Sequence, residues 1–218
     1  MNNSKQERNQ NRSESIQYPV FPLPIFILPG GMQRLRIFES KYVSMIANAE
    51  QTDGFVVALY QKESAFLVPE WGVHVQIVDF DQGEDGILTV DVLADGMVSL
   101  SHFDEQKGGL LIAQTFSLPH WSSNKGVDST SYDSSDNGPI EQVQFKLSSV
   151  LKGVFSAHYE LSDLYQTQFF DYPEWVCARL LEIIPLSLTE KERFVQQLDY
   201  TQLTTLLSIL CEKELNKD

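Results

Sequence analysis

The sequence contains few cysteines and no long apolar run. Its two cysteines, Cys177 and Cys211, lie outside the CxxC spacing of redox pairs and zinc sites, so we expect two reduced thiols in the core. No apolar stretch approaches the roughly 20 residues that span a bilayer, and residues 1–17 have no apolar segment for a signal peptide. These absences predict a cytoplasmic protein without a membrane partner.

Positive charge is also scarce. The 218 residues include 16 Lys and Arg against 30 Asp and Glu, which gives a net charge of −14. Such a surface repels phosphate backbones and anionic lipid headgroups, because like charges oppose association. We therefore expect no nucleic-acid partner, and we expect acidic charge around a binding groove to favour basic segments of polypeptide.

Motifs that support catalysis are absent or out of context. No GxxxxGK[ST] loop is present to cradle nucleotide phosphates. The SxxK string at residues 149–152 and the SDN string at residues 135–137 match parts of a serine acyl-enzyme signature, but they stand in the wrong order and the chain has no KTG. The sequence therefore predicts no catalytic residue.

The possible metal ligands also lack the required spacing. No two histidines form an HxH or HxxxH pair that would place both rings on one face. The acidic stretch at residues 79–85 has Gly83 at the fifth position, whereas a calcium-binding EF-hand needs glycine at the sixth. We expect a solvated hairpin tip there, and no metal or other cofactor. The histidines are His74, His102, His120 and His158.

Residues 18–49 form the unit around which the rest of the chain is organised. Four prolines interrupt its first half, and a proline cannot donate to a sheet ladder, so we expect this run at a sheet edge or a strand start. From Glu39 the apolar positions recur at helical spacing until Asp53 and Gly54 stop the pattern. The unit is predicted to be an edge strand, a glycine turn and an amphipathic helix. The prolines are Pro19, Pro22, Pro24 and Pro29.

Short strands follow this helix. Residues 55–60 are apolar throughout, residues 65–68 are a possible hairpin partner, and residues 73–78 alternate as a half-buried strand does. Further strands are expected at residues 87–93, 97–103 and 110–118, with glycine turns between them. Many short strands at this spacing indicate a small closed or half-open β-barrel.

The composition then changes twice. Residues 122–138 are polar and rich in Ser and Asp, which predicts a linker or a long loop. The remaining residues, 139–218, carry helical apolar stripes, with Pro173 in a first helical turn, Thr189 and Glu192 as a capping box, and Asp199 as the cap of the last helix. We expect a helical bundle there, and a disordered tail at residues 1–17.

The order of motifs resembles a known family. The string FPLPIFILPGGMQRLRIFESKY at residues 21–42, the run Leu93-Ala94-Asp95-Gly96 and the string ARLLEIIPLSLTEKERFVQQLD at residues 178–199 are similar to the amino-terminal, substrate-binding domain of Lon-type ATP-dependent proteases. That domain also occurs in small stand-alone proteins. The resemblance implies an α+β fold with a small β-barrel-like (PUA-like) unit at residues 18–121 and a helical bundle at residues 139–218. It implies neither the ATPase nor the protease domain.

The chain departs from the family at one position. After Gly96, where the family usually carries an arginine, it reads Met97-Val98. No role of that basic side chain can therefore be carried over to this protein.

Six residues are candidates for peptide binding. The carboxylate of Glu39 has a structural explanation, because a helix start favours negative charge and free amides can donate to it. Its alternative is that the helix beginning at Glu39, Ser40 and Lys41 borders a recognition groove. The aromatic side chains Phe26, Trp71 and Trp121 are the other candidates, because aromatic residues anchor apolar peptides.

Two functions remain open from the sequence. The first is a non-catalytic module that holds unfolded or apolar polypeptide segments, as the resemblance implies. It would use free strand edges or an apolar groove between barrel and bundle. The second is an adaptor that docks one specific protein, such as a separate ATPase or protease. The oligomeric state is not predicted.

Overall fold

The computed structural model describes residues 15–83, 85–123, 138–195, 197 and 199–215. Most of the predicted tail and linker lies outside these residues. At their borders, the first strand begins at Ile16, and residues Trp121–Ser123 form a short 3-10 helix, η1.

Six strands form one sheet within the described residues. The pairing order is β2-β5-β4-β3-β1-β6, and β5 also pairs with β6. The pairings therefore link β5, β4, β3, β1 and β6 into a ring, with β2 attached to the first half of β5. The mixed α+β fold is confirmed. The strands are β1 (Ile16–Leu23), β2 (Met32–Ile37), β3 (Phe55–Leu59), β4 (Trp71–Gln82), β5 (Leu88–Glu105) and β6 (Leu111–Ser117).

The prediction that the proline-rich run lies at a sheet edge is wrong, because β1 lies between β3 and β6. The two neighbours share little of its length: β6 pairs with residues 16–20 and β3 with residues 20–23. Pro19 therefore pairs only with β6 and Pro22 only with β3. Each half of β1 has one open side, where a missing N–H breaks no ladder.

Two other strand predictions need correction. The expected strands at residues 87–93 and 97–103 are one continuous strand, β5, because Ala94 and Gly96 stay paired with Val75 and His74 of β4. The expected hairpin partner at residues 65–68 consists of turns and bends. Its residues close turns instead: the N–H of Gln61 donates to the carbonyl oxygen of Leu67, and the N–H of Leu67 donates to the carbonyl oxygen of Ser64.

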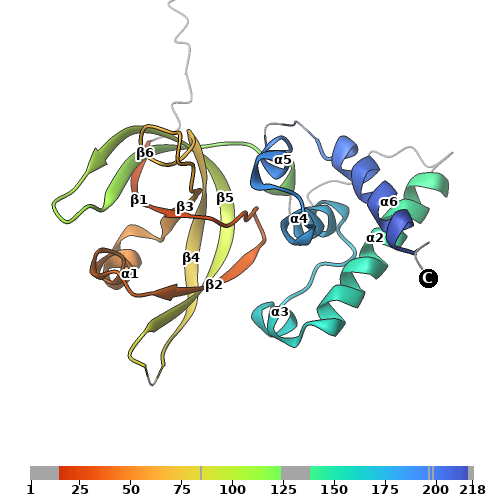
Figure 1. Cartoon of the computed structure of the whole chain (residues 1–218), viewed down its shortest axis with the longest axis horizontal. Coiled ribbons are helices and arrows are strands. Elements are labelled where there is room, and N and C mark those ends of the chain that lie inside the picture. The colour runs from red at the N-terminus through yellow and green to blue at the C-terminus, as the bar shows by residue number, and fades with distance from the viewer. Residues whose placement is uncertain (1–14, 84, 124–137, 196, 198, 216–218) are drawn as a thin grey trace, which may run out of the picture.

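Helices lie on both sides of the strands (Figure 1). Helix α1 packs beside the strands at one end of the molecule, and α2 to α6 gather at the other end. Helix α2 contacts α3, α4 and α6. The helices are α1 (Ser40–Thr52), α2 (Gly138–Ala157), α3 (Tyr159–Leu164), α4 (Pro173–Ile183), α5 (Leu188–Glu192) and α6 (Thr201–Leu215).

The helix starts were predicted with mixed success. Pro173 is in the first turn of α4, and Asp199 accepts a hydrogen bond from the N–H of Thr201, the first residue of α6, as expected. The predicted capping box is wrong by two residues: Ser187 and Glu190 form it. Both pairs have the same spacing, but Ser187 is the residue in the extended conformation that an N-cap requires.

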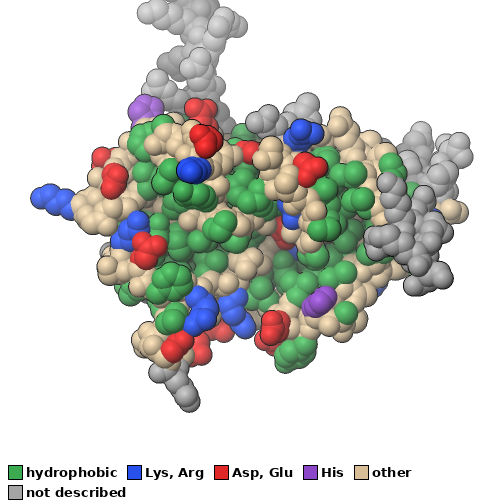
Figure 2. Space-filling model, in the orientation of Figure 1, with side chains coloured by type: hydrophobic (Ala, Val, Ile, Leu, Met, Phe, Trp, Pro, Cys, Tyr) green, Lys and Arg blue, Asp and Glu red, His purple; other side chains and the backbone are tan. Residues whose placement is uncertain are grey.

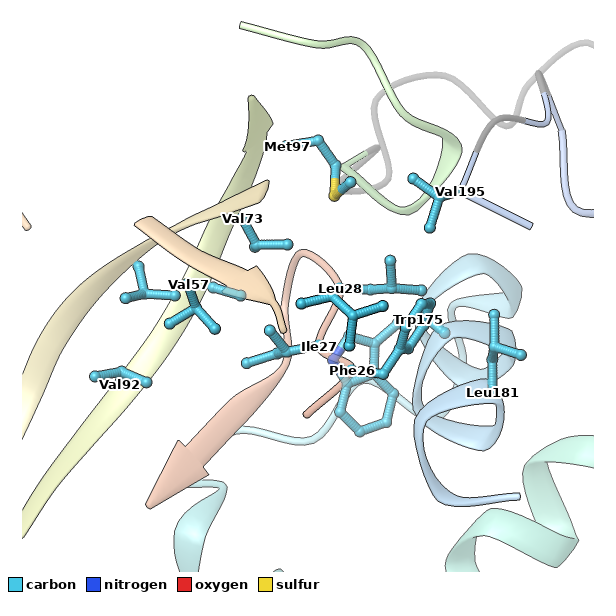
Figure 3. Packing of buried hydrophobic residues seen from close by; sticks show 14 of the residues in the cluster. Phe26, Ile27, Leu28, Val57, Val73, Val92, Met97, Trp175, Leu181 and Val195 are labelled. Carbon is cyan, nitrogen blue, oxygen red and sulfur yellow. The ribbon is translucent and has the colours of Figure 1, made fainter. Parts of the chain in front are cut away.

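One hydrophobic core joins the strands to the helices. Its fully buried members include Leu28 from the loop after β1, Val92 from β5 and Leu181 from α4, and Figure 3 shows them on facing elements. Met97, at the departure from the family pattern, is also buried there. In the part of the chain that is described, no helix combines the length and apolarity that crossing a membrane requires.

Candidate functional site

Three predicted aromatic residues lie where the strands meet the helices. Phe26 and Trp71 are in edge contact, with ring centroids 6.4 Å apart. The Nε1 of Trp71 donates to Glu192 Oε1 at 2.9 Å, and the Nε1 of Trp121 donates to the carbonyl oxygen of Phe194 at 3.3 Å. All three side chains are buried. They join strand and loop segments to the helical part, and their predicted role as peptide anchors stays a prediction.

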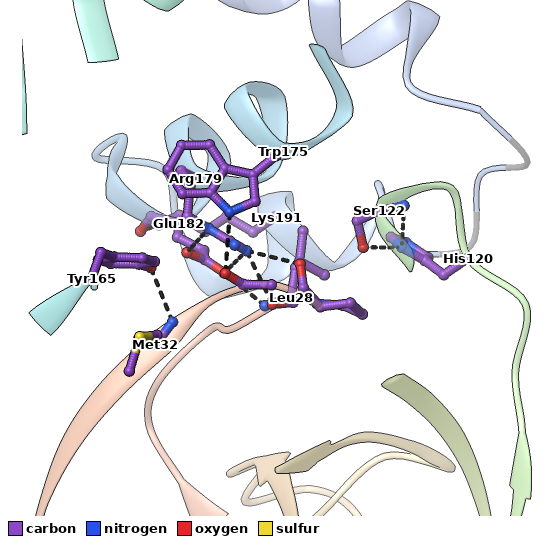
Figure 4. Close-up of polar contacts among 11 residues, drawn as sticks. Leu28, Met32, His120, Ser122, Tyr165, Trp175, Arg179, Glu182 and Lys191 are labelled. Atoms are coloured by element: carbon purple, nitrogen blue, oxygen red, sulfur yellow. Dashed lines mark hydrogen bonds and ion pairs between the residues drawn. The ribbon is translucent and has the colours of Figure 1, made fainter. Parts of the chain in front are cut away.

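A buried ion pair holds the same junction together (Figure 4). Arg179 of α4 is 1% exposed, and its Nε and Nη2 donate to the two carboxylate oxygens of Glu182, both at 2.7 Å. Nη2 also donates to the carbonyl oxygen of Leu28 at 3.0 Å, and Glu182 Oε1 accepts from the N–H of Leu28 at 2.7 Å. The pair therefore satisfies both backbone groups of one loop residue.

Further hydrogen bonds fix the loop between β1 and β2 against the helices. Trp175 Nε1 donates to the carbonyl oxygen of Gly30 at 3.2 Å, and the hydroxyl of Tyr165 accepts from the N–H of Met32 at 3.0 Å. A Cβ at Gly31 would lie 2.7 Å from Glu182 Oε1, so the loop can approach this closely only because residue 31 is glycine. The loop is held at successive points by side chains from the helical part.

Burial changes the ionisation of this junction. Burial raises the pKa of Glu182 above its usual value, and the positive charge of Arg179 is the main influence that lowers it. Burial also lowers the pKa of Lys191, whose Nζ donates to the carbonyl oxygen of Glu182. Burial also raises the pKa of Tyr165 to about 12 and lowers the pKa of His120 to about 4. Tyr165 and His120 are therefore neutral at pH 7.

The other three predicted residues lie at the start of α1, away from the junction. Glu39 is the N-cap residue of α1, but its side chain makes no capping hydrogen bond, so the structural explanation from amide donors is wrong. Its carboxylate lies 3.6 Å from Lys41 Nζ, which also reaches the carbonyl oxygen of Gly109 at 3.3 Å. Ser40 is exposed as the first residue of the helix.

A groove with a volume of about 600 Å³ lies between α1 and the far end of β4. Its walls are mostly apolar, and several of them are exposed although hydrophobic: Phe80 is 71% exposed, Val78 45% and Val43 40%. Helix α1 does border a groove, but Glu39, Ser40 and Lys41 are not in its walls. The lining residues are Val43, Ile46, Ala47 and Ala49 from α1, Asp53 and Gly54 after it, Gln76, Ile77, Val78, Asp79 and Phe80 from β4, and Leu88 from β5.

The strand that lines this groove has one open edge. Strand β3 pairs with β4 only at residues 73–75, whereas β5 pairs with β4 up to Gln82. Within the part of the chain that the structure describes, residues 76–82 therefore have a neighbouring strand on one side alone. The groove consequently combines an apolar helix face with a strand edge. Figure 2 shows that exposed hydrophobic side chains also gather in the middle of the visible face, between the strands and the helices.

The described residues do not assemble a reactive centre. Among them, no group of three His, Cys, Asp or Glu side chains could hold a metal ion. The hydroxyl of Ser149, from the SxxK string, donates to the carbonyl oxygen of Phe145 in its own helix. The SDN string lies outside the described residues. His74 and His120 are buried, and His102 and His158 are exposed.

Sequence reasoning missed the residues that matter most to the junction and the groove. Arg179 and Glu182 lie three residues apart in the otherwise apolar run of residues 175–183, and such a pair is a signal for a buried ion pair. Val78 and Phe80 continue a hydrophobic strand past the residues that β3 covers, but only the sheet topology shows that this edge is open.

Comparison with known proteins identifies the fold and the family. The chain is similar to a Lon N-terminal domain protein from Xanthomonas campestris, with 23% identity, a TM-score of 0.62, and coverage of 88% of this chain and 96% of that one. It is also similar to the N-terminal domain of a Lon protease from the Mycobacterium avium complex, with 12% identity, a TM-score of 0.60, and coverage of 90% and 98%. At these identities the two structures establish the fold.

No curated protein sequence matches the chain. The model of one family, the substrate-binding domain of the ATP-dependent protease La (LON), matches residues 17–212. This match covers nearly all of the sequence and confirms the resemblance seen in its motifs. The chain therefore belongs to the LON substrate-binding domain family.

Proposed function

We propose that this protein is a non-catalytic module that binds segments of polypeptide, and that the groove between α1 and β4 is its binding site. The family to which the chain belongs is described as a substrate-binding domain of a protease. The observation that carries the proposal is the groove itself: about 600 Å³ of mostly apolar surface with exposed Val43, Val78 and Phe80. Exposed apolar concavities of this kind mark interaction sites.

The buried junction is a poorer candidate for the site. Phe26, Trp71 and Trp121 already fill the space between strands and helices, and the indole N–H groups of Trp71 and Trp121 already donate to partners within the chain. A peptide would have to displace these contacts before it could bind. The groove at α1 needs no such displacement, because Val43, Val78 and Phe80 in its walls are exposed.

A peptide array tests the proposal. Apolar and basic segments should bind with micromolar affinity, whereas folded control proteins should not. The variant Val43→Glu places a charge in the groove wall and should weaken binding at least about tenfold, because a carboxylate resists burial against apolar groups. Ser44→Glu is the matched control, because Ser44 is exposed on the same helix and does not line the groove.

Two results would overturn the proposal. If no peptide binds, the protein does not recognise polypeptide segments in general, and the prediction of an adaptor with one dominant partner would gain support. If peptides bind but the two variants behave alike, the segments bind elsewhere on the protein.

A further inference from the structure

The open edge of β4 is a row of backbone groups next to an apolar wall. In an antiparallel pair, every second residue turns its N–H and C=O away from the neighbouring strand. Over residues 76–82 the groups on the far side from β5 face no strand in the described part of the chain. Such an edge is a template for another extended segment.

The groove runs along this edge and not across one face of the sheet. Five consecutive residues of β4, from Gln76 to Phe80, line it. Successive side chains of a regular strand point to opposite faces, so even with the register shift between Ile77 and Asp79 a groove on one face would not touch five residues in a row. Contact with all five places the groove at the strand edge, where the backbone is accessible.

The opposite wall is a single face of α1. Val43, Ile46 and Ala47 lie three and four residues apart, which is the spacing of one helical face. A segment lying against β4 would therefore turn one set of its alternating side chains towards an apolar helix surface. Strand addition with an apolar pocket for alternate side chains combines affinity from the backbone with selectivity from the side chains.

The charges of the groove select the kind of segment. Among the described residues that line it, Asp53 and Asp79 are the ionisable ones, and none is Lys or Arg. The N–H of Phe80 donates to the carboxylate of Asp79 at 2.9 Å. A carbonyl oxygen of an added strand can accept a hydrogen bond from the N–H of Phe80 in place of Asp79. The carboxylate of Asp79 is then free to pair with a cationic side chain. A second copy of this chain, with its net charge of −14, is a poor match.

We propose that the groove binds one extended, apolar and basic polypeptide segment by strand addition to β4 over residues 76–82. Apolar side chains of the segment pack on α1, and its Lys or Arg side chains pair with Asp53 and Asp79. The matching length is about seven residues, or on the order of 20 Å at the rise of a strand. This inference rests on the proposed function and adds the mode of binding and the class of segment.

The test compares two peptides with the same side chains. The first is a fluorescein-labelled peptide of about seven residues, in which Val and Thr alternate between terminal Lys residues. In the second, two amides on the strand-pairing side are N-methylated, and a third peptide methylated on the other side is the control. Fluorescence polarisation should show binding of the first, and the second should bind about tenfold more weakly, as expected for two lost hydrogen bonds.

The results separate the two proposals. If both methylated peptides bind as tightly as the unmodified one, side chains alone mediate binding, which overturns strand addition and leaves the groove as a binding site. If the unmodified peptide does not bind, strand addition is overturned together with the proposed function for this class of segment. Equal weakening by methylation on either side would also contradict pairing with one edge.

A second experiment tests the charge of the segment. Asp79→Asn keeps an oxygen that can accept from Phe80 but removes the charge, so the Lys-ended peptide should bind about threefold more weakly at low salt. A version of the peptide with neutral ends should bind both proteins equally. Asp104→Asn is the matched control, because Asp104 is exposed on β5 and lies outside both the groove and residues 76–82. An equal effect of both variants would contradict the assignment.

Discussion

Replacing Arg179 with methionine should destabilise the protein by about 3–5 kcal/mol at neutral pH, the cost of leaving one partner of a buried ion pair uncompensated. Arg179 is 1% exposed and donates to both oxygens of Glu182 and to the carbonyl oxygen of Leu28. Methionine occupies a similar volume, so the loss is mainly electrostatic. For a domain of this size the midpoint of thermal unfolding should fall by roughly 6–20 °C.

The loss should depend on pH in a defined direction. Burial raises the pKa of Glu182 above the usual 4.5, and Arg179 is the main influence that lowers it. A carboxyl whose folded pKa is raised binds more protons in the folded state, so stability falls as the pH rises from the unfolded towards the folded pKa. Without Arg179 the pKa should rise further. The variant should therefore lose more stability at about pH 8 than at about pH 5.

Urea unfolding followed by far-UV circular dichroism measures this at both pH values. The double variant Arg179→Met/Glu182→Gln removes the buried charge but keeps an oxygen that can accept from Leu28. It should recover about 1–3 kcal/mol relative to the single variant at about pH 8. If the single variant loses the same free energy of unfolding at both pH values, and the double variant recovers nothing, the buried carboxylate does not cause the instability.

Three further predictions concern single positions. Gly54→Ala should destabilise the protein by more than about 2 kcal/mol, because φ of Gly54 is +106° and a Cβ would collide with the carbonyl oxygen of Val75. Gly153→Ala in α2 should leave stability unchanged or raise it by up to about 1 kcal/mol, because a Cβ there meets nothing within 4 Å. Equal losses of stability in thermal unfolding of the two variants would refute this contrast. Ser187→Ala should cost about 1 kcal/mol by loss of the capping box of α5, measured by urea unfolding, and Ser187→Thr should retain most of it. Cys177 is buried, and burial raises the pKa of its thiol to about 12, so the thiol should react with a maleimide only after the protein unfolds. Mass spectrometry maps the labelled residue, and rapid labelling of Cys177 in the folded protein would contradict the structure.

Periodicity predicted the elements whose structure is decided locally. The alternation at residues 73–78 predicted part of β4, and the helical stripe that includes Leu147 and Leu151 predicted α2, where both side chains are buried. These predictions succeeded because the pattern of apolar residues follows the geometry of the element itself. Pro173 marked the start of α4 for an equally local reason, the absence of its N–H.

Predictions about neighbouring strands were less successful. The prolines of β1 indicated an edge strand, but the strand lies between two others that pair with different halves of it. The run of residues 93–96 indicated a break between two strands, but β5 is continuous. The proline signal was correct in kind, because each half of β1 has an open side, but the sequence does not show which strand pairs with the other side. The predicted break in β5 was wrong, because pairing with β4 continues through Ala94 and Gly96.

The amino-acid sequence by itself determined the α+β composition, the family, the acidic surface and the approximate position of most helices and strands, because these depend on residue type and on spacing along the chain. Only the tertiary structure decided that Arg179 and Glu182 bind the loop after β1, more than 140 residues away in the chain. It also decided that β3 ends its pairing with β4 at Val75 and so leaves residues 76–82 open beside α1. Both features depend on contacts between segments distant in sequence, and local periodicity carries no information about such contacts.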